Sequence, residues 1–244
     1  MGVRLFDRNR RQVILTPAGH TLLSHARQVI AEADAIPAAL THTAALRIGH
    51  VSWLPPQLRD LDEPAVDIDE WVLPSHVQQD RVAAGTLDAA VTVSLADHPT
   101  LTQQLLWSEP LPAITPIGHP AASRGMVPAA ELTVLIDRDE HTWGSWNAWA
   151  TEFAHQSGAD IVTTTTTTNG ALTGTGLFAH CHRLRRPVLR CARRHTATQP
   201  PDLITLAVTN PTPLWPWVLA TRADDQRPTI NLLRHAAANT MKQP

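Results

Sequence analysis

The chain has 244 residues, a hydrophobic fraction of 43% and a formal net charge of -2. This length allows one or two domains with a sizeable core, and the near-neutral charge excludes a uniformly basic nucleic-acid-binding protein. Its 2 cysteines cannot make a disulfide-rich secreted scaffold.

No apolar run reaches the roughly 18 residues that a membrane helix needs, because Pro, Asp, Arg or His interrupts each one. The first residues also lack the apolar core of a secretory leader. We therefore expect a cytoplasmic protein that does not contact a membrane.

Charge is unevenly distributed along the chain. Residues 1–27 hold five arginines and one acid, whereas residues 57–97 hold nine acids and two arginines. This asymmetry indicates a basic end suited to a polyanion and a segment that avoids one. Six more arginines lie between Arg183 and Arg194, where a solvated surface is the ordinary interpretation.

Residues 3–15 have the pattern of two short strands joined by a polar, basic turn. Thr16 and Pro17 then predict the start of a helix, because Thr caps free helical N–H groups and Pro has no N–H to leave unpaired. Apolar residues recur at helical spacing from Leu22 to Ile36. With no nearby partner for this stripe, we expect it to pair with the same helix of a second chain.

From residue 46 onward, short apolar runs alternate with helical patterns. Residues 46–51, 66–72 and 88–93 are candidate strands, and residues 77–85 form a candidate helix that ends at Gly85. Strand, helix and strand in this order predict a parallel α/β sheet.

The alternation restarts after a proline-rich stretch and predicts a second α/β subdomain. Its first elements are strands at 132–136 and 161–165 around a tryptophan-rich helix at 143–155. By pattern alone, strands at 203–208 and 214–220 and a helix at 230–239 complete it. Residues 184–199 show no clear period.

Several motifs resemble LysR-type transcriptional regulators. Residues 2–8 (Gly-Val-Arg-Leu-Phe-Asp-Arg) and 13–19 (Val-Ile-Leu-Thr-Pro-Ala-Gly) resemble the wing and the start of the linker helix. Residues 46–49 (Leu-Arg-Ile-Gly), 84–90 (Ala-Gly-Thr-Leu-Asp-Ala-Ala) and 119–122 (His-Pro-Ala-Ala) follow in the order that the family's effector domain has.

The resemblance implies an α/β fold with a two-lobed, periplasmic-binding-protein-like effector domain, preceded by a remnant winged-helix wing and a long linker helix. The implied division is a wing at 1–16, a linker and dimerisation helix at 17–45 and an effector domain at 46–244. Within that domain the first lobe takes about 46–114 and 209–223, and the second about 115–208. The hinge is expected near 114–116.

The family's recognition helix precedes the wing, and this sequence begins where that helix ends. We therefore expect an N-terminally truncated regulator, whose remaining candidates for DNA contact are Arg8, Arg10 and Arg11. Such arginines contact phosphates, which position a protein without reading sequence.

Small ligands of two-lobed α/β domains bind at the carboxyl ends of strands, where helix N-termini offer N–H groups to an anion. Ser52 follows the first strand and Ser75 precedes the next helix, so both are candidate effector contacts, with turn or cap formation as the alternative. Thr115 on the crossover strand and Asn169 at the next helix are the candidates of the second lobe. We expect a small-molecule effector, with an anion as the first candidate class.

Two other clusters have weaker functional interpretations. His180, Cys181 and His182, with Cys191 and His195, are metal-ligand residue types, but their spacing is not that of a zinc site. Among the 8 tryptophans, those at helical spacing (Trp146 and Trp149) are more often core residues than a ligand box.

The sequence contains no hydrolase, metalloprotease, P-loop or dinucleotide fingerprint, so we expect neither an enzyme nor a cofactor. The predicted function is a LysR-like DNA-binding regulator that responds to an effector, as a homodimer or tetramer formed through the linker helix. The competing interpretations are an effector-binding module without sequence-specific DNA binding and, third, a metal-dependent enzyme that uses the His/Cys run.

Overall fold

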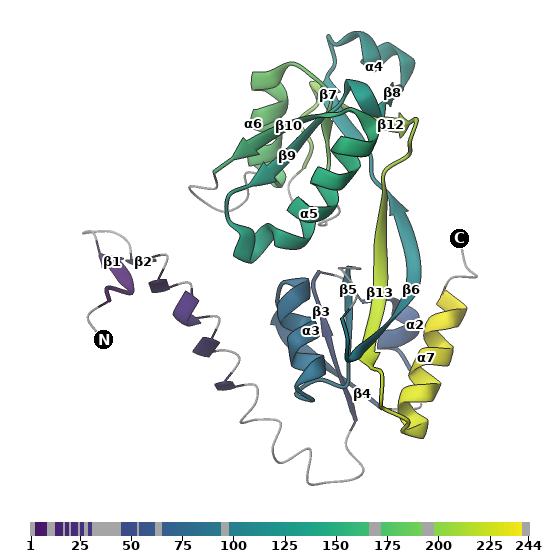
Figure 1. The fold of residues 1–244 in the computed structure, drawn as a ribbon. Coiled ribbons are helices and arrows are strands. Elements are labelled where there is room, and N and C mark those ends of the chain that lie inside the picture. The colour runs from purple at the N-terminus through teal and green to yellow at the C-terminus, as the bar shows by residue number, and fades with distance from the viewer. Residues whose placement is uncertain are drawn as a thin grey trace. The chain divides into compact units, whose positions relative to one another are not determined.

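The computed structural model describes residues 3–8, 13–16, 45–52, 54–61, 65–93, 98–165, 172–191 and 198–240, and parts of 18–30. The chain forms two compact units, residues 1–45 and residues 46–244 (Figure 1). The smaller unit contains a hairpin and helical residues, and the larger contains two β-sheets.

The hairpin of the smaller unit pairs β1 (Phe6–Arg8) antiparallel with β2 (Val13–Leu15), which confirms the two predicted strands. Thr16 follows and caps the next helix, because its hydroxyl oxygen accepts a hydrogen bond from Gly19 N at 3.0 Å. A Cβ atom at Gly19 would lie 2.1 Å from Leu5 O, so only glycine lets the helix pass this close to the hairpin.

Every described residue from 18 to 30 is helical, as the cap and the apolar stripe predict. Residues 31–44 lie outside the described part of the chain. The pairing of this helix with a second chain stays a prediction.

The first sheet of the larger unit has the strand order β4-β3-β5-β13-β6. β3 pairs in parallel with β4 and with β5, whereas β13 pairs antiparallel with β5 and with β6. The predicted parallel sheet is therefore only partly correct, because β13 enters from the second sheet in the opposite direction. The strands are β3 (Leu46–His50), β4 (Val66–Val72), β5 (Ala89–Val93), β6 (Leu101–Pro110) and β13 (Leu214–Arg222).

Helices pack on both faces of this sheet, and together with it they form what we call the first lobe. α3 (Ser75–Ala83) packs on β5 and β13, and α7 (Pro228–Thr240) packs on β6 and on α2 (Pro56–Arg59). In Figure 1, α3 and α7 lie on opposite sides of the sheet. The last strand and the terminal helix thus belong to the first lobe, which corrects the assignment made from pattern alone.

α3 lies very close to β3. A Cβ atom at Gly49 would lie 2.4 Å from Gln78 Oε1, so the glycine makes room for the Gln78 side chain. The amide Nε2 of Gln78 donates to His50 O at 2.9 Å and to Trp71 O at 3.0 Å. One helical side chain therefore joins two neighbouring strands.

A buried ion pair lies under the same helix. Arg81 donates from Nη1 to Asp69 Oδ2, and their side chains are 1% and 5% exposed. Nη1 also reaches Gln78 Oε1 at 3.3 Å, whereas Nε and Nη2 are buried without a hydrogen-bond partner among the described residues. Asp69 thus provides the only carboxylate paired with this cation in the described part of the chain.

The second sheet has the order β10-β9-β11-β7-β12-β8 and forms the second lobe with the helices between residues 120 and 184. α5 packs on β9 and β10, and α6 packs on β7. The strands are β7 (Ala113–Pro116), β8 (Met126–Pro128), β9 (Thr133–Asp137), β10 (Asp160–Thr164), β11 (Val188–Leu189) and β12 (Leu203–Thr209). The helices are α4 (Pro120–Arg124), η1 (Ala129–Glu131), α5 (Glu140–Ser157) and α6 (Gly174–Leu184).

The chain crosses between the lobes at two adjacent points. β6 and β13 run side by side out of the first sheet (Figure 1), and where they end Leu111 N donates to Pro213 O at 2.9 Å. Ile114 and Thr115 already pair with Thr205 and Ile204 in the second sheet. The outward crossing therefore lies between β6 and β7, and the return lies between β12 and β13. The hinge expected near 114–116 stays a prediction.

Candidate functional site

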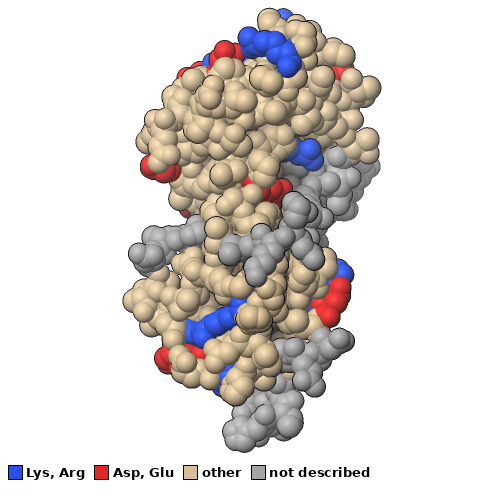
Figure 2. Space-filling view, turned by 90° about the vertical axis from the view of Figure 1, so that its right-hand side faces the viewer, with Lys and Arg blue, Asp and Glu red and all other residues tan. Residues whose placement is uncertain are grey.

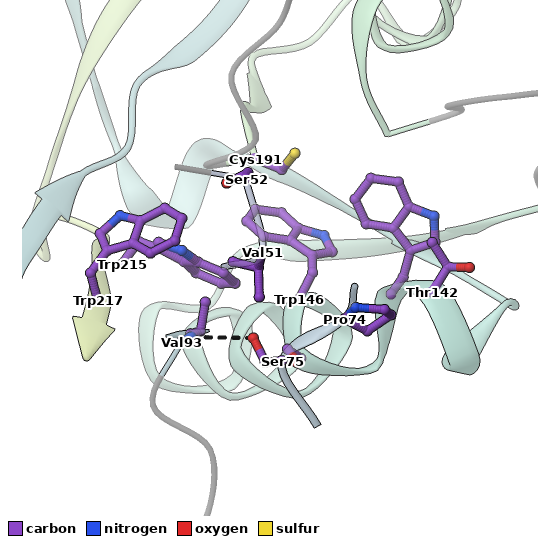
Figure 3. A pocket seen from close by; sticks show the side chains of 12 residues that line it. Val51, Ser52, Pro74, Ser75, Val93, Thr142, Trp146, Cys191, Trp215 and Trp217 are labelled. Carbon is purple, nitrogen blue, oxygen red and sulfur yellow. Dashed lines mark hydrogen bonds between the residues drawn. The ribbon is translucent and has the colours of Figure 1, made fainter. Parts of the chain in front are cut away.

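A pocket lies between the two lobes, at the carboxyl ends of β3 and β5 (Figure 3). Parallel strands and the helices that follow them place loop residues and helix starts at this edge of the sheet. The lining residues are Val51, Ser52, Pro74, Ser75 and Val93 from the first lobe, Thr142, Trp143, Ser145, Trp146 and Cys191 from the second, and Trp215 and Trp217 from β13.

The first-lobe wall is fixed by a hydrogen bond between two of its elements. Val93 N at the end of β5 donates to Ser75 Oγ at 3.2 Å (Figure 3). Ser75 is buried and begins α3. Its hydroxyl therefore joins strand to helix while its residue forms part of the pocket wall.

The opposite wall is aromatic. Trp146 on α5 and Trp215 on β13 have ring centroids 5.5 Å apart, and Trp149 meets Trp215 edge to face at 5.2 Å. Trp146 Nε1 donates to Leu135 O at 2.8 Å, and Trp149 Nε1 donates to Leu214 O at 3.2 Å. These contacts hold α5 of the second lobe against the strand that returns to the first.

The expected core role is confirmed for Trp146, which is 5% exposed and packs in the main core, whereas Trp149 is partly buried against that core. Trp146 also lines the pocket, so the same side chain belongs to the hydrophobic core and to the pocket wall. Trp215 is equally buried, and its Nε1 has no acceptor among the described residues. A buried donor without an acceptor is costly.

The pocket is partly open to solvent, and its volume is about 50 Å³. An engineered cavity that binds benzene in another protein has a volume of about 150 Å³. The pocket as it stands is therefore small for an aromatic ring, and a ligand of that size requires the lobes to separate.

Carboxylates gather where α5 begins, next to the pocket wall. Asp139 Oδ1 accepts from Thr142 N at 3.3 Å, and Asp137 Oδ1 accepts from Asp139 N at 2.8 Å. Glu140 Oε1 accepts from Asn147 Nδ2 at 3.1 Å. In the first turn of α5, Thr142 N is therefore already paired with a protein carboxylate.

Two histidines from opposite lobes flank the pocket. His76 follows Ser75 and His141 precedes Thr142, and their ring centroids are 5.7 Å apart. Burial, and then the nearby His141, lower the pKa of His76, while Asp80 opposes the shift. The neutral form of His76 is thus favoured where the lobes meet.

The predicted site residues divide into three groups. Ser52 and Ser75 line one pocket. Thr115 is buried on β7 and is not part of the lining; its Oγ1 has no hydrogen-bond partner among the described residues. Asn169 lies outside the described residues.

Of the predicted DNA contacts, the structure describes the backbone of Arg8 alone. Arg8 ends β1, and its side chain lies outside what the structure describes, as do Arg10 and Arg11. In the larger unit, Figure 2 shows a face on which charged side chains stand apart among uncharged ones.

Several residues that line the pocket were not predicted from the sequence. Thr142 and Ser145 share the face of α5 that Trp146 occupies, and helical spacing from that tryptophan could have found them. Trp215 and Cys191 come from distant segments. Only tertiary structure brings them to the pocket.

The His/Cys run is divided between different environments. Cys181 is buried, and its Sγ lies 4.0 Å from Ile114 O; burial raises the pKa of its thiol to about 12. His182 is exposed near Asp202, with Nε2 and Oδ2 3.7 Å apart, and His195 lies outside the described residues. The described part of the chain holds no group of three potential metal ligands.

No helix among the described residues is both long and apolar enough to cross a membrane.

Comparison with known proteins gives consistent matches. Residues 41–242 match the family model described as LysR substrate binding domain. A "Probable hydrogen peroxide-inducible genes activator" of Mycobacterium avium is 32% identical over 158 residues, which are 58% of this chain and 50% of that protein. The chain thus spans about half the length of this relative.

Two solved structures share the fold. A full-length OxyR variant from Pseudomonas aeruginosa matches with a TM-score of 0.56 at 19% identity, covering 100% of this chain and 85% of that one. The BenM effector binding domain with its effector benzoate matches with a TM-score of 0.56 at 16% identity, covering 80% and 90%.

Proposed function

Because the chain belongs to the LysR substrate binding domain family, we propose that it senses a small-molecule effector as part of a LysR-type transcriptional regulator. The observation that carries this proposal is the pocket lined by both lobes at the ends of β3 and β5. A ligand there contacts Ser52 on one side and Thr142 on the other. Its binding energy therefore acts on the distance between the lobes.

Lobe closure is the step that links the ligand to regulation. The lobes are joined at two adjacent crossings beside the paired strands β6 and β13, so they can rotate about them as hinge-connected domains do. A ligand that binds one arrangement better shifts the population toward it, and DNA affinity and effector affinity then change each other reciprocally.

DNA is the proposed second partner. Arg8, Arg10 and Arg11 supply positive charge at the hairpin, and the helix from Thr16 is the proposed dimer contact, with a homodimer or tetramer acting in the cytoplasm. The alternative is an effector-binding module without sequence-specific recognition, because phosphate contacts alone carry no sequence information.

We propose a bound molecule, and not oxidation of Cys181, as the signal. The relative from Mycobacterium avium is named for peroxide-inducible genes, and a peroxide response needs a reactive thiolate. Burial raises the pKa of Cys181 to about 12, which leaves almost no thiolate at neutral pH.

The effector role is tested with a blocked pocket. A metabolite library is screened by thermal shift on the wild-type chain, on Ser52→Phe, which fills the pocket, and on Ser123→Phe on exposed α4 as the control. Compounds that raise the melting temperature of the wild type and of the control, and not of Ser52→Phe, support the proposal. Stabilisation that persists in Ser52→Phe argues against this pocket.

The DNA role is tested by selection of genomic fragments. This chain and the protein translated from its whole open reading frame are each incubated with sheared genomic DNA, and retained fragments are sequenced. Enrichment of a common site that changes with a library hit supports the regulator. Retention without a common site by both proteins favours the module.

A further inference from the structure

The described lining of the pocket contains no charged side chain. Tryptophan provides most of the large surfaces, and polarity comes from hydroxyl groups in both lobes: Ser52, Ser75, Thr142 and Ser145. Aromatic walls bind flat apolar molecules through burial and ring contacts. Hydroxyl groups donate to or accept from neutral polar groups without requiring a ligand charge.

The N-termini of helices are the usual source of anion affinity at strand ends. Here the starts of α3 and α5 differ in the affinity for an anion that they provide. α3 begins at Ser75 without a side-chain cap, so its first amides are electropositive. At α5, Thr142 N is paired with the Asp139 carboxylate and Trp143 N with Asp139 O. The start of α5 therefore offers little N–H capacity to an anion.

The charge beside α5 is negative. Residues 137–140 hold three carboxylates and one arginine, a local balance of -2. Neither Asp139 nor Glu140 forms an ion pair with another described residue. Carboxylates this close to the wall repel an anion, and they do so more strongly once a closing site excludes water.

From this wall we propose that the effector of the pocket is an uncharged aromatic molecule with a hydrogen-bonding group, and that the pocket discriminates against the anion of the same shape. This inference rests on the proposed function, since it names the class of molecule that the same pocket takes. It replaces the expectation of an anionic effector.

The unpaired Trp215 Nε1 favours a ligand that carries a hydrogen-bond acceptor. A ligand that brings an acceptor oxygen to this wall supplies the partner that the described residues do not. Trp215 packs against Trp146 and Trp149, so a ligand acceptor bonded to Trp215 would lie next to the contact between α5 and β13.

Benzamide and benzoate form the matched pair for the test, because they have nearly the same shape and differ in charge. Their dissociation constants are measured by calorimetry on the wild-type chain and on Asp139→Asn/Glu140→Gln. Asparagine caps a helix as well as aspartate, so this variant removes two charges and keeps the cap. Glu131→Gln/Glu152→Gln is the control, since it removes two exposed charges of the same lobe, and residue 152 lies about 15 Å along α5 from residue 142.

We expect benzamide to bind the wild type about tenfold or more tightly than benzoate, since like charges in a closing site cost at least this much. Asp139→Asn/Glu140→Gln should strengthen benzoate binding and leave benzamide unchanged, and the control should change neither. The inference is overturned if benzoate binds the wild type as tightly as benzamide does. It is also overturned if Asp139→Asn/Glu140→Gln and the control change the ratio of the two dissociation constants equally. Absence of benzamide binding overturns it too.

The two failures are distinguishable. If anionic compounds from the library bind the wild type and lose binding in Ser52→Phe, the pocket is an effector site and only the ligand class is wrong. If benzamide binds Ser52→Phe as well as the wild type, the site itself is elsewhere, and the proposed function fails with it.

Discussion

Replacing Asp69 by asparagine removes the charged partner of a buried guanidinium. Arg81 is 1% exposed, and two of its nitrogens already have no hydrogen-bond partner among the described residues. After the substitution the cation keeps Gln78 Oε1 at 3.3 Å as its remaining described acceptor besides the new amide. Breaking a buried pair in this way typically costs about 3–5 kcal/mol.

The effect on melting temperature follows from the size of the chain. About 1 kcal/mol changes the melting temperature by roughly 2–4 °C in a protein of this length, so Asp69→Asn should lower it by about 6–20 °C. Urea denaturation followed by circular dichroism gives the corresponding free energy, provided that the slope stays that of the wild type.

A double variant separates the missing charge from the lost packing. Asp69→Leu/Arg81→Met replaces both charges by apolar side chains, and such replacements are often neutral or stabilising. It should therefore be more stable than Asp69→Asn. A single variant within about 1 kcal/mol of the wild type, or a double variant less stable than the single one, refutes the reasoning that this pair is buried in a low dielectric.

Three further outcomes follow from buried polar groups. Burial lowers the pKa of His50, with Asp69 opposing the shift, and burial also lowers the pKa of His76, so the unfolded chain binds protons more readily than the folded chain. The free energy of unfolding should therefore be highest above about pH 6.5 and decrease as the pH falls below this value. His50→Gln should make this decrease smaller in urea titrations at several pH values. The Cys181 thiol, with a pKa raised to about 12, should react with iodoacetamide at pH 8 only as fast as the chain unfolds, and rapid alkylation in the native state measured by mass spectrometry contradicts this burial. Thr115→Val removes a buried hydroxyl without a described partner and should stabilise by about 1 kcal/mol in thermal melts, with effector affinity unchanged; a loss of affinity would instead support the ligand role first expected for Thr115.

Local sequence patterns were enough to predict the helices and strands in which apolar residues recur several times at a regular spacing. The strands predicted at 46–51 and 88–93 are observed as β3 (Leu46–His50) and β5 (Ala89–Val93). The helix predicted to end at Gly85 is α3 (Ser75–Ala83), and Gly85 itself has the left-handed φ of 79° that favours glycine. β6 was not predicted because its polar residues, among them Gln103 and Gln104, occupy a strand at the edge of the sheet. Residues 188–189 form a strand of two residues, too short for any period to be visible.

The candidate site was predictable only where it depends on chain order. Ser52 and Ser75 follow from the rule that ligands bind at strand ends. Trp215 and Cys191 do not, because they reach the pocket through pairings with strands distant in sequence. The ligand charge that we propose differs from the one expected from the sequence for a similar reason, since the carboxylates near α5 lie on the second lobe and the uncapped helix start of α3 lies on the first.

The two adjacent crossings make the second lobe an insertion within the first. The first lobe begins at β3, and after the second lobe the chain returns along β13 and ends with α7 packed on β6. Leu111 and Pro213 are already hydrogen-bonded where the strands part, so a short turn in place of residues 112–212 would convert β6 and β13 into a continuous hairpin. The first lobe should therefore fold by itself after this excision, and recombination could exchange one inserted lobe for another without rebuilding the sheet that carries it.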